Sequence, residues 1–268
     1  GDGEVRASED NNGNGKLDGG SIGNLLWNAA DNIPVFDQSD NTTDRKIFTY
    51  KYDTTSTPKA NEGIAFTCAN LSANQKAELG IADCGNANDI GVWRFNYILG
   101  DWSHEQRHPF REKIDTIRPP KTSTDLAIFR NRTHINKDTK ALEGSDPWLL
   151  GDIVNSNPAY VSDENYNYDK LPSTYSEGSS YKSFVAGNAT RRKMVYVGAN
   201  DGMLHAFDAS ATGGDAGKEM FAFIPNSIFD RLSELTSPDY GHQYTVDGSP
   251  RAGDVYFGGS WHTVLVGT

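Results

Sequence analysis

The sequence lacks any long apolar run. Its 268 residues contain no hydrophobic stretch near the roughly 18 residues that a transmembrane helix needs, so we predict no membrane span. An excess of positive charge is also missing, because the formal net charge is −11 at pH 7 and the pI is about 4.9. Such a surface repels a phosphate backbone, which excludes nucleic acid as an expected partner.

Cysteine is scarce, with only Cys68 and Cys84 present. The two are too far apart for a C-x-x-C redox motif, and a metal site would need further ligands. In a cytosolic protein they would be reduced thiols. In a secreted protein they would form a disulfide that closes a short loop and stabilises the fold by about 3 kcal/mol. We favour the disulfide.

A leader sequence is missing as well. The sequence begins at Gly1 without a charged and then apolar segment, a start that we expect of a processed product or of a fragment. The length suffices to bury a core in one large β domain or two ordinary domains. The 27 glycines and the charges of both signs are typical of a turn-rich β protein.

The strongest local pattern is a set of three short strands. Met194–Ala199 and Met203–Ala209 alternate apolar with small or polar residues, at the period of two that a strand requires. Asn200–Gly202 between them suits a tight hairpin turn. A looser turn at Ser210–Gly217 leads to a third strand, Glu219–Pro225. Three consecutive antiparallel strands form most of a β-propeller blade.

Further elements are expected on both sides of residue 148. Strands are predicted at Lys46–Tyr52, after Asn155–Pro158 and near Ser183–Ala186. A short helix is predicted over Asn70–Gly80, between the cysteines, with a capping box and a terminal glycine. A second helix is predicted over Asp89–Gly100. Its apolar stripe, typical of a core helix, comprises Ile90, Trp93, Tyr97 and Ile98.

A calcium loop is predicted near the start of the chain. Residues 10–18 fit the pattern D-x-N-x-N-G-x-x-D, in which alternate oxygen-bearing residues converge on a hard cation and glycine permits the turn. The candidate ligands are Asp10, Asn12, Asn14, the Lys16 carbonyl and Asp18. The twelfth position is Ser21 rather than glutamate, so we expect modest affinity. The alternative is a polar loop of Asx turns without metal.

His104–His108 reads H-E-x-x-H, the string that holds zinc in many metalloproteases when it lies on a helix. Pro109 follows directly and favours extended geometry at His108, while Gly100 ends the helix before it. We therefore expect an exposed polar loop here and assign no catalytic residue. A zinc protease remains the weaker alternative.

Four blocks of sequence support a family resemblance. They are LLGDIVNSNPAYV (149–161), VYVGANDGMLHAFDA (195–209), KEMFAFIP (218–225) and YTVDGSPRAGDVYF…WHTVLVG (244–267). In this order they resemble the conserved β-propeller domain of the PilC/PilY type IV pilus adhesins. The calcium-type loop and the helix between the cysteines are similar to features of the same family, although they are less specific.

The resemblance implies a mainly β fold. We expect a propeller of about seven blades, of which residues 149–268 form the first two or so. Residues 1–148 would be an irregular lead-in segment with short helices. The chain stops at Thr268 part-way through a blade, which would expose a sheet edge, so either further sequence or another chain is expected to complete it. The family's second calcium loop and its variable N-terminal adhesive region are not seen in this sequence.

The resemblance also implies a function without catalysis. It implies a bacterial surface protein, at the pilus tip or outer membrane, that acts in pilus extension, adhesion and twitching motility. The implied partners are minor pilins and a host or abiotic surface, and Ca²⁺ is the implied cofactor. We hypothesise that calcium modulates these activities. No R-G-D tripeptide is present, so integrin binding through such a motif is not carried over.

Two alternatives share the propeller architecture. A quinoprotein dehydrogenase would need a stacking tryptophan, for which Trp148 or Trp261 is available, but blade packing explains both more simply. A propeller that binds carbohydrate or protein without any link to pili is the other. Four aspartates stand beside glycines or at strand ends and are interpreted as turn and cap residues. They are Asp152, Asp201, Asp208 and Asp247.

Overall fold

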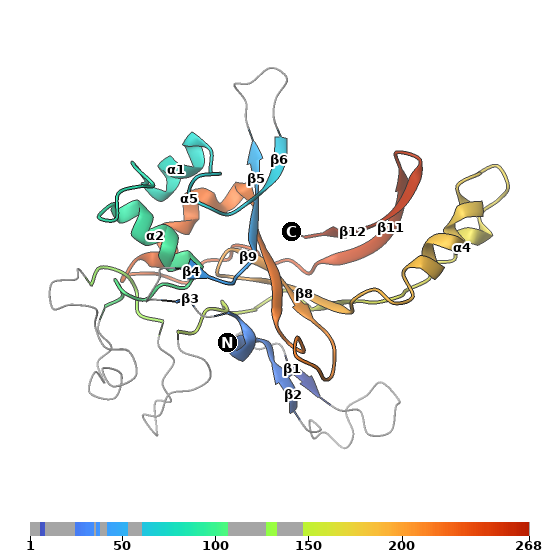
Figure 1. The fold of residues 1–268 in the computed structure, drawn as a ribbon, viewed down its shortest axis with the longest axis horizontal. Coiled ribbons are helices and arrows are strands. Elements are labelled where there is room, and N and C mark those ends of the chain that lie inside the picture. The colour runs from blue at the N-terminus through green and yellow to red at the C-terminus, as the bar shows by residue number, and fades with distance from the viewer. Residues whose placement is uncertain are drawn as a thin grey trace.

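The fold is mainly β, with three of the described helices gathered beside one end of a central sheet and the helix at Gly178–Gly187 apart from them on the other side (Figure 1). It is a computed structural model. The residues that it describes are 6–8, 25–34, 36–37, 42–52, 61–106, 127–132 and 147–267. None of the described helices has the length and apolarity required to cross a bilayer.

A six-stranded sheet forms the centre of the molecule. Its spatial order is β6-β5-β10-β9-β8-β7. The bounds are β5 (Ile47–Tyr52), β6 (Asn61–Ala65), β7 (Ala159–Val161), β8 (Met194–Ala199), β9 (Met203–Asp208) and β10 (Glu219–Ile224). Every neighbouring pair is antiparallel except β10 and β5, which are parallel. The sheet therefore joins a late antiparallel meander to an early hairpin.

Strands β7 to β10 follow one another in space as in sequence, which is the arrangement of a four-stranded blade. The three predicted strands and the strand after Pro158 are confirmed. The turn between β8 and β9 requires glycine, because Gly202 has φ +89° and a Cβ there would lie 2.6 Å from Ile228 Cδ1. The predicted strand near Lys46–Tyr52 is also confirmed, as β5.

Three smaller sheets surround the central one. The longest is the antiparallel hairpin of β11 (Arg251–Phe257) and β12 (Ser260–Val266). The others pair β1 (Arg6–Ser8) with β2 (Leu25–Asn28), and β3 (Phe36–Asp37) with β4 (Thr42–Thr43). None of these sheets closes on itself within the described residues.

The two predicted helices between residues 70 and 100 are confirmed. Helix α1 (Ala73–Leu79) starts with the Ser72–Gln75 capping box and ends at the left-handed Gly80. Helix α2 (Ile90–Leu99) is capped by the Asp89 carboxylate, which accepts hydrogen bonds from two backbone N–H groups. The predicted stripe is wrong at one end, since the Ile90 side chain is 46% exposed while Phe95 is buried.

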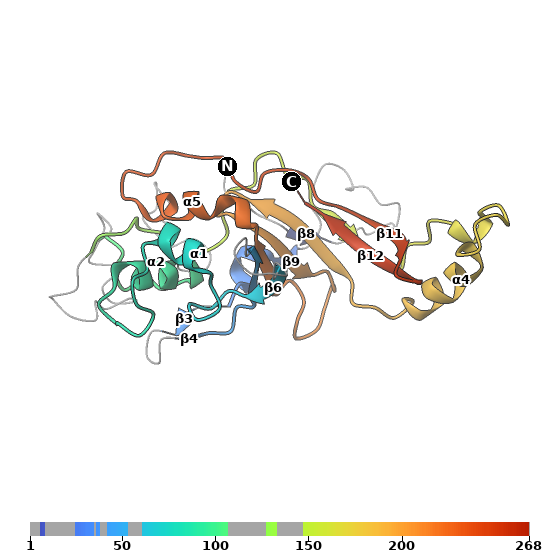
Figure 2. The same cartoon turned by 90° about the horizontal axis from the view of Figure 1, so that it is seen from above.

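The strand predicted near Ser183–Ala186 is wrong, because this segment is part of helix α4 (Gly178–Gly187). Tyr181, Phe184 and Val185 recur at intervals of three and four, which places them on one helical face. Tyr181 is fully buried, and its ring lies 4.6 Å from that of Trp261. Figure 2 shows α4 beside the far end of the β11–β12 hairpin.

The remaining helical elements are short. Helix α5 (Phe229–Leu232) packs against α1. Single 3-10 turns complete the set, at η2 (Ala29–Asn32), η3 (Tyr168–Lys170), η4 (Asn226–Ile228) and η5 (Glu234–Thr236).

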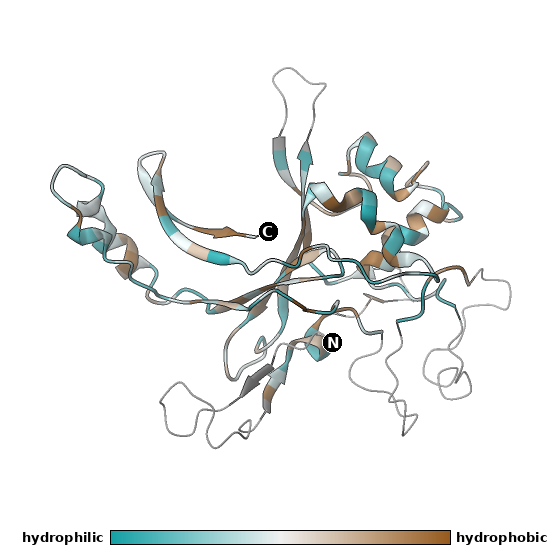
Figure 3. Ribbon diagram, turned by 180° about the vertical axis from the view of Figure 1, so that it is seen from behind, coloured by the Kyte–Doolittle hydropathy of each residue, from teal (hydrophilic) through white to brown (hydrophobic). Residues whose placement is uncertain are grey.

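One face of the central sheet carries two hydrophobic clusters, and apolar residues run through the central strands and the helices beside them (Figure 3). Cluster 1 packs α1, α2 and α5 onto Ile47, Met203 and Ile224. Cluster 2 packs residues 26–33 and 148–153 onto Val197, Ala199 and Phe207. The pairing register places all six strand residues on the same face.

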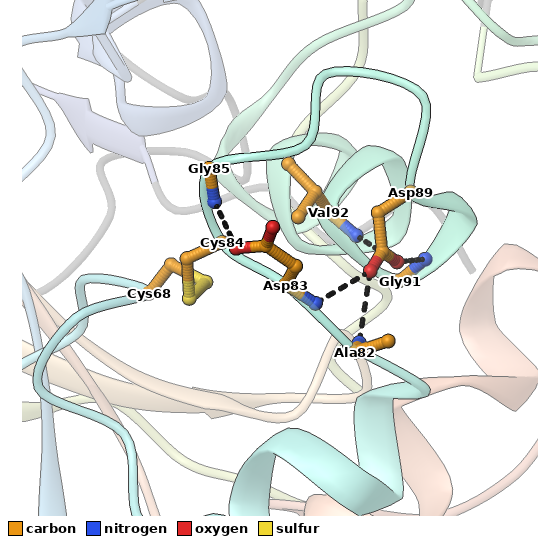
Figure 4. The surroundings of a disulfide bond; sticks show 8 residues. All are labelled: Cys68, Ala82, Asp83, Cys84, Gly85, Asp89, Gly91 and Val92. Atoms are coloured by element: carbon orange, nitrogen blue, oxygen red, sulfur yellow. Dashed lines mark hydrogen bonds between the residues drawn. A yellow bond between two sulfur atoms is a disulfide. The ribbon is translucent and has the colours of Figure 1, made fainter.

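The predicted disulfide between Cys68 and Cys84 is present, with a Cα–Cα distance of 5.8 Å. Figure 4 shows that the loop behind Cys84 is held by Asp89. The Asp89 carboxylate accepts hydrogen bonds from the backbone of Ala82 and Asp83, and from that of Gly91 and Val92. The disulfide therefore holds the segment from Cys68 to Cys84, which includes α1, against cluster 1.

We predict that replacing both cysteines by serine lowers the free energy of unfolding by about 3 kcal/mol, because the loop that the disulfide closes becomes free in the unfolded chain. Denaturant titration of the purified protein under oxidising conditions measures the change. The wild type in reducing buffer is the matched control and should lose a similar amount. Equal stability of the serine variant and the oxidised wild type would contradict the prediction.

Candidate functional site

The candidate site begins with a bulge in β10. The register of the β10–β9 ladder shifts between Glu219 and Phe221, so the usual alternation of faces is interrupted there. As a result Glu219 lies on the same face as Ala222 and points into the space between clusters 1 and 2. Its side chain is completely inaccessible to solvent.

A chain of charged side chains leads from Glu219 in both directions, and we call Arg45, Glu219, His205 and Asp201 the ionic chain. Arg45 donates two hydrogen bonds to the Glu219 carboxylate, at 2.7 and 2.8 Å. His205 Nδ1 lies 2.8 Å from Glu219 Oε1, and His205 Nε2 lies 3.0 Å from Asp201 Oδ2. The ionic chain links the segment before β5 with β10, β9 and the β8–β9 turn.

The pKa values of this chain favour the charged forms. Burial lowers the pKa of His205, but the Asp201 and Glu219 carboxylates outweigh it and raise the pKa to about 9. Burial raises the pKa of Glu219, but Arg45 and His205 bring it down to about 2. The pKa of Arg45 is raised, because Glu219 outweighs its burial. At neutral pH Arg45 and His205 are therefore cations, and Glu219 between them is an anion.

The outer end of the ionic chain holds a group of loops. Asp201 Oδ2 accepts a hydrogen bond from the Gly151 amide at 2.8 Å. A Cβ on Gly151 would collide with the Asp201 amide nitrogen, so the two backbones approach as closely as glycine allows. The preceding residue, Asn200, is 2% exposed, and its side-chain oxygen accepts a hydrogen bond from the Thr245 backbone amide at 3.0 Å.

Three of the blocks that define the family resemblance meet at this point. We call residues 151–157, 200–202 and 242–249 the loop cluster. Asn155 donates two hydrogen bonds to the Asp247 carboxylate, one from its backbone and one from its side chain. The Asn157 amide donates to Ser249 Oγ at 2.9 Å. The N-S-N-P loop before β7 is thereby joined to the V-D-G-S-P loop before β11.

The structure bears out the interpretation of Asp201 and Asp208 as turn and cap residues, because each carboxylate accepts a hydrogen bond from the backbone amide two residues further on. The Asp247 carboxylate accepts its backbone hydrogen bond from Asn155, which is 92 residues away in the sequence. The fourth, Asp152, instead binds the side chain of His242. The arrangement fixes the positions of loops. Arg45, Glu219 and His205 were not predicted as site residues. The available signal was a polar or charged residue within or just before an otherwise apolar strand.

A family model for the PilY1 β-propeller domain matches residues 150–268. Type IV pilus biogenesis factor PilY1 of Pseudomonas aeruginosa is 42% identical in strain PAK and 46% identical in strain PAO1, each over 178 residues. Residues 150–268 belong to the PilC/PilY family. A PilY1 homolog of Xylella fastidiosa is 49% identical over 123 residues, which are 45% of this chain and 9% of that protein.

The two Pseudomonas matches cover 64% of this chain and 14% of each relative. The chain thus spans about a seventh of the length of these PilC/PilY relatives. The crystal structure of the P. aeruginosa PilY1 C-terminal domain covers 40% of this chain and 19% of its own chain, at 40% identity and a TM-score of 0.29.

The PilC/PilY match confirms the predicted fold class. The matched residues form one four-stranded blade, β7 to β10, followed by the β11–β12 hairpin of a second, so the propeller is incomplete within this chain. The division at residues 148 and 149 stays a prediction. The central sheet takes β5 and β6 from the lead-in segment and the other four strands from the propeller segment.

The predicted calcium ligands lie outside the described residues. These are Asp10, Asn12, Asn14, Lys16 and Asp18. Two carboxylates, two side-chain amides and a backbone carbonyl remain a donor set that suits a hard cation, and calcium binding by this PilC/PilY chain stays a prediction.

The described part of the H-E-x-x-H string does not form the helix that a zinc site of this type requires. Glu105 pairs with Phe129 in a β-bridge, and its carboxylate binds Arg132 at 2.7 Å. The His104 ring stacks on Trp93, with 3.9 Å between ring centroids. His108 lies outside the described residues. These contacts give His104 and Glu105 packing and pairing roles.

We predict that the ionic chain makes stability depend on pH at both ends. The folded pKa of His205, about 9, lies above its unfolded value of 6.5, so its contribution is complete below pH 6.5 and is lost as pH rises through 9. The loss should be on the order of 3 kcal/mol. Glu219 contributes fully above pH 4.5, and this contribution is lost as pH falls towards 2.

Chemical denaturation across this pH range measures both effects. His205→Gln should be less stable at pH 6 and should lose most of the decline between pH 6.5 and 9. His262→Gln, at a half-buried position of β12 outside the ionic chain, is the control and should keep that decline. An identical pH profile for the wild type and His205→Gln would refute the assignment.

Proposed function

We propose that this chain belongs to a type IV pilus biogenesis factor that also acts as a surface adhesin and performs no catalysis. The observation that carries this proposal is the PilY1 β-propeller match over residues 150–268. It is supported by relatives of 42–49% identity that are named type IV pilus biogenesis factors or their homologs. The loop cluster adds support, because the residues that define the resemblance form one hydrogen-bonded unit.

The proposed partners follow from this role. Minor pilins or the pilus tip would be the assembly partner, and a host or abiotic surface would be the target of adhesion. The proposed location is the bacterial cell surface, at the pilus tip or in association with the outer membrane. The remaining blades would come from further sequence or from another chain. The disulfide suits this location, since such bonds persist in oxidising compartments.

We further propose that calcium modulates pilus extension, adhesion and twitching motility through the lead-in segment. Residues 10–18 would hold the ion with the oxygens of Asp10, Asn12, Asn14, Lys16 and Asp18. When bound, the ion would neutralise the two carboxylates and stiffen the loop that precedes the propeller segment.

The pilus role predicts that damage to the blade abolishes pili. In the full-length protein, Gly151→Val forces a side chain into the Asp201 backbone and should separate the first loop of the loop cluster from the β8–β9 turn. We expect few or no surface pili by electron microscopy and loss of twitching zones, with protein level followed by immunoblot. Gly187→Val, where a Cβ would meet nothing within 4 Å, should keep normal pili. Normal piliation in the Gly151→Val strain would contradict the proposal.

The calcium role predicts a separate defect. Asp10→Ala with Asp18→Ala in the full-length protein should remove about one bound calcium ion per chain, because it removes both carboxylates of the loop. Elemental analysis and an absorbance scan of the purified protein measure calcium, zinc and quinone together. Asp169→Ala with Asp239→Ala, at two exposed positions, is the control. Unchanged calcium content and unchanged pilus display would reject the calcium role, and stoichiometric zinc or a quinone band would reject a non-enzymatic function.

A further inference from the structure

We propose that the ionic chain is a conformational coupling device, which transmits a change at Arg45 in the lead-in segment to the loop at 242–249 that begins the second blade. Arg45 does not contact that loop through any of its hydrogen bonds. These go to Glu219, to the Ile98 carbonyl at 3.3 Å and to Met203 Sδ at 3.6 Å. The inference is independent of the pilus role proposed above.

No solvent reaches Arg45, Glu219 or His205 to replace their partners in the ionic chain. The side chains of Arg45, Glu219 and His205 are 1%, 0% and 0% exposed. They lie on the sheet face between clusters 1 and 2. In such surroundings an unpaired charge is far more costly than at the surface, so the loss of one member forces the others to move or to change protonation.

Each residue of the ionic chain has the next one as a main partner. Glu219 Oε1 is shared between Arg45 Nη2 at 2.8 Å and His205 Nδ1 at 2.8 Å. His205 uses its other nitrogen for Asp201, at 3.0 Å. If the Arg45 charge is removed, Glu219 keeps His205 as its one cation. The balance between Glu219 and Asp201 for the imidazolium then shifts toward Glu219.

The β8–β9 turn belongs to both the ionic chain and the loop cluster. Asp201 faces inward to His205, and the adjacent Asn200 faces the loops. Asn200 Nδ2 lies 3.4 Å from Asp152 Oδ2 and 3.5 Å from Asp247 Oδ1. Its oxygen accepts the Thr245 amide at 3.0 Å. A displacement of Asp201 must therefore alter the hydrogen bonds that hold residues 245–247.

The structure provides a matched control for this idea in a second buried arginine. Arg132 binds the Glu105 carboxylate at 2.7 Å and the carbonyls of Tyr97 and Asp101 at 2.7 and 2.8 Å. It resembles Arg45 in chemistry and burial, with a side chain 10% exposed. None of these bonds reaches the ionic chain or the loop cluster. Its replacement should destabilise the protein without acting on residues 242–249.

Hydrogen exchange of the full-length protein, followed by mass spectrometry, tests the coupling. Arg45→Met should raise the exchange rate of peptides covering 150–157 and 242–249 by about tenfold or more. Arg132→Met should raise exchange near residues 97–106 and leave 242–249 within about twofold of the wild type. Faster exchange at 42–52 and 219–224 alone in Arg45→Met would overturn the proposal. So would equal acceleration of 242–249 in both variants.

A milder pair of variants decides the matter if Arg45→Met does not fold. Arg45→Lys keeps the charge but loses the two-pronged contact with Glu219, and Asp247→Asn weakens the distant loop. A double-mutant cycle compares the change in the exchange rate of 242–249 in the double variant with the product of the changes in the two single variants. Coupling requires that these two values differ by more than about threefold. Effects that simply multiply would overturn the proposal.

Discussion

The ion pair between Arg45 and Glu219 is the interaction on which the rest of the structure depends. It lies where the early β5–β6 hairpin meets the late meander, at the parallel junction of β5 and β10. A buried pair of this kind adds little net stability compared with well-packed apolar residues. The loss of one partner, however, costs roughly 3–5 kcal/mol. The pair therefore selects this junction over alternative pairings of the same strands. His205 and Asp201 extend the selection to the β8–β9 turn.

Much of the local structure could be predicted, because its causes are local. The period-two alternation of β8 and β9 and the Gly202 turn are properties of neighbouring residues. The Ser72–Gln75 box and Gly80 likewise define both ends of α1 without reference to the rest of the chain. The disulfide was predictable from the presence of only two cysteines around a short helix. The family resemblance then supplied the blade.

The features that sequence reasoning missed are non-local. The side chain of Glu219 faces inward because of a bulge in the ladder with β9, and strand alternation alone would place it with Phe221 on the other face. The parallel pairing of β5 with β10 joins Ile47 to Ala222, which no short-range pattern encodes. Helix α4 was mistaken for a strand because its few apolar residues pack on Trp261, far along the chain. The ionic chain and the loop cluster were missed for the same reason, since each depends on contacts between distant segments.

The same β5–β10 junction has a consequence for the order in which the chain can assemble. The Thr49 hydroxyl bonds to the Ile224 carbonyl across 175 residues, so β5 leaves the ribosome or the export channel long before its neighbour exists. Until β10 arrives, the β5–β6 hairpin presents an unpaired edge and the exposed aromatic rings of Phe48 and Tyr50. Such an edge invites pairing with another chain. The hairpin thus stays open to such pairing until β10 has been made, and this edge closes only when β10 pairs with β5.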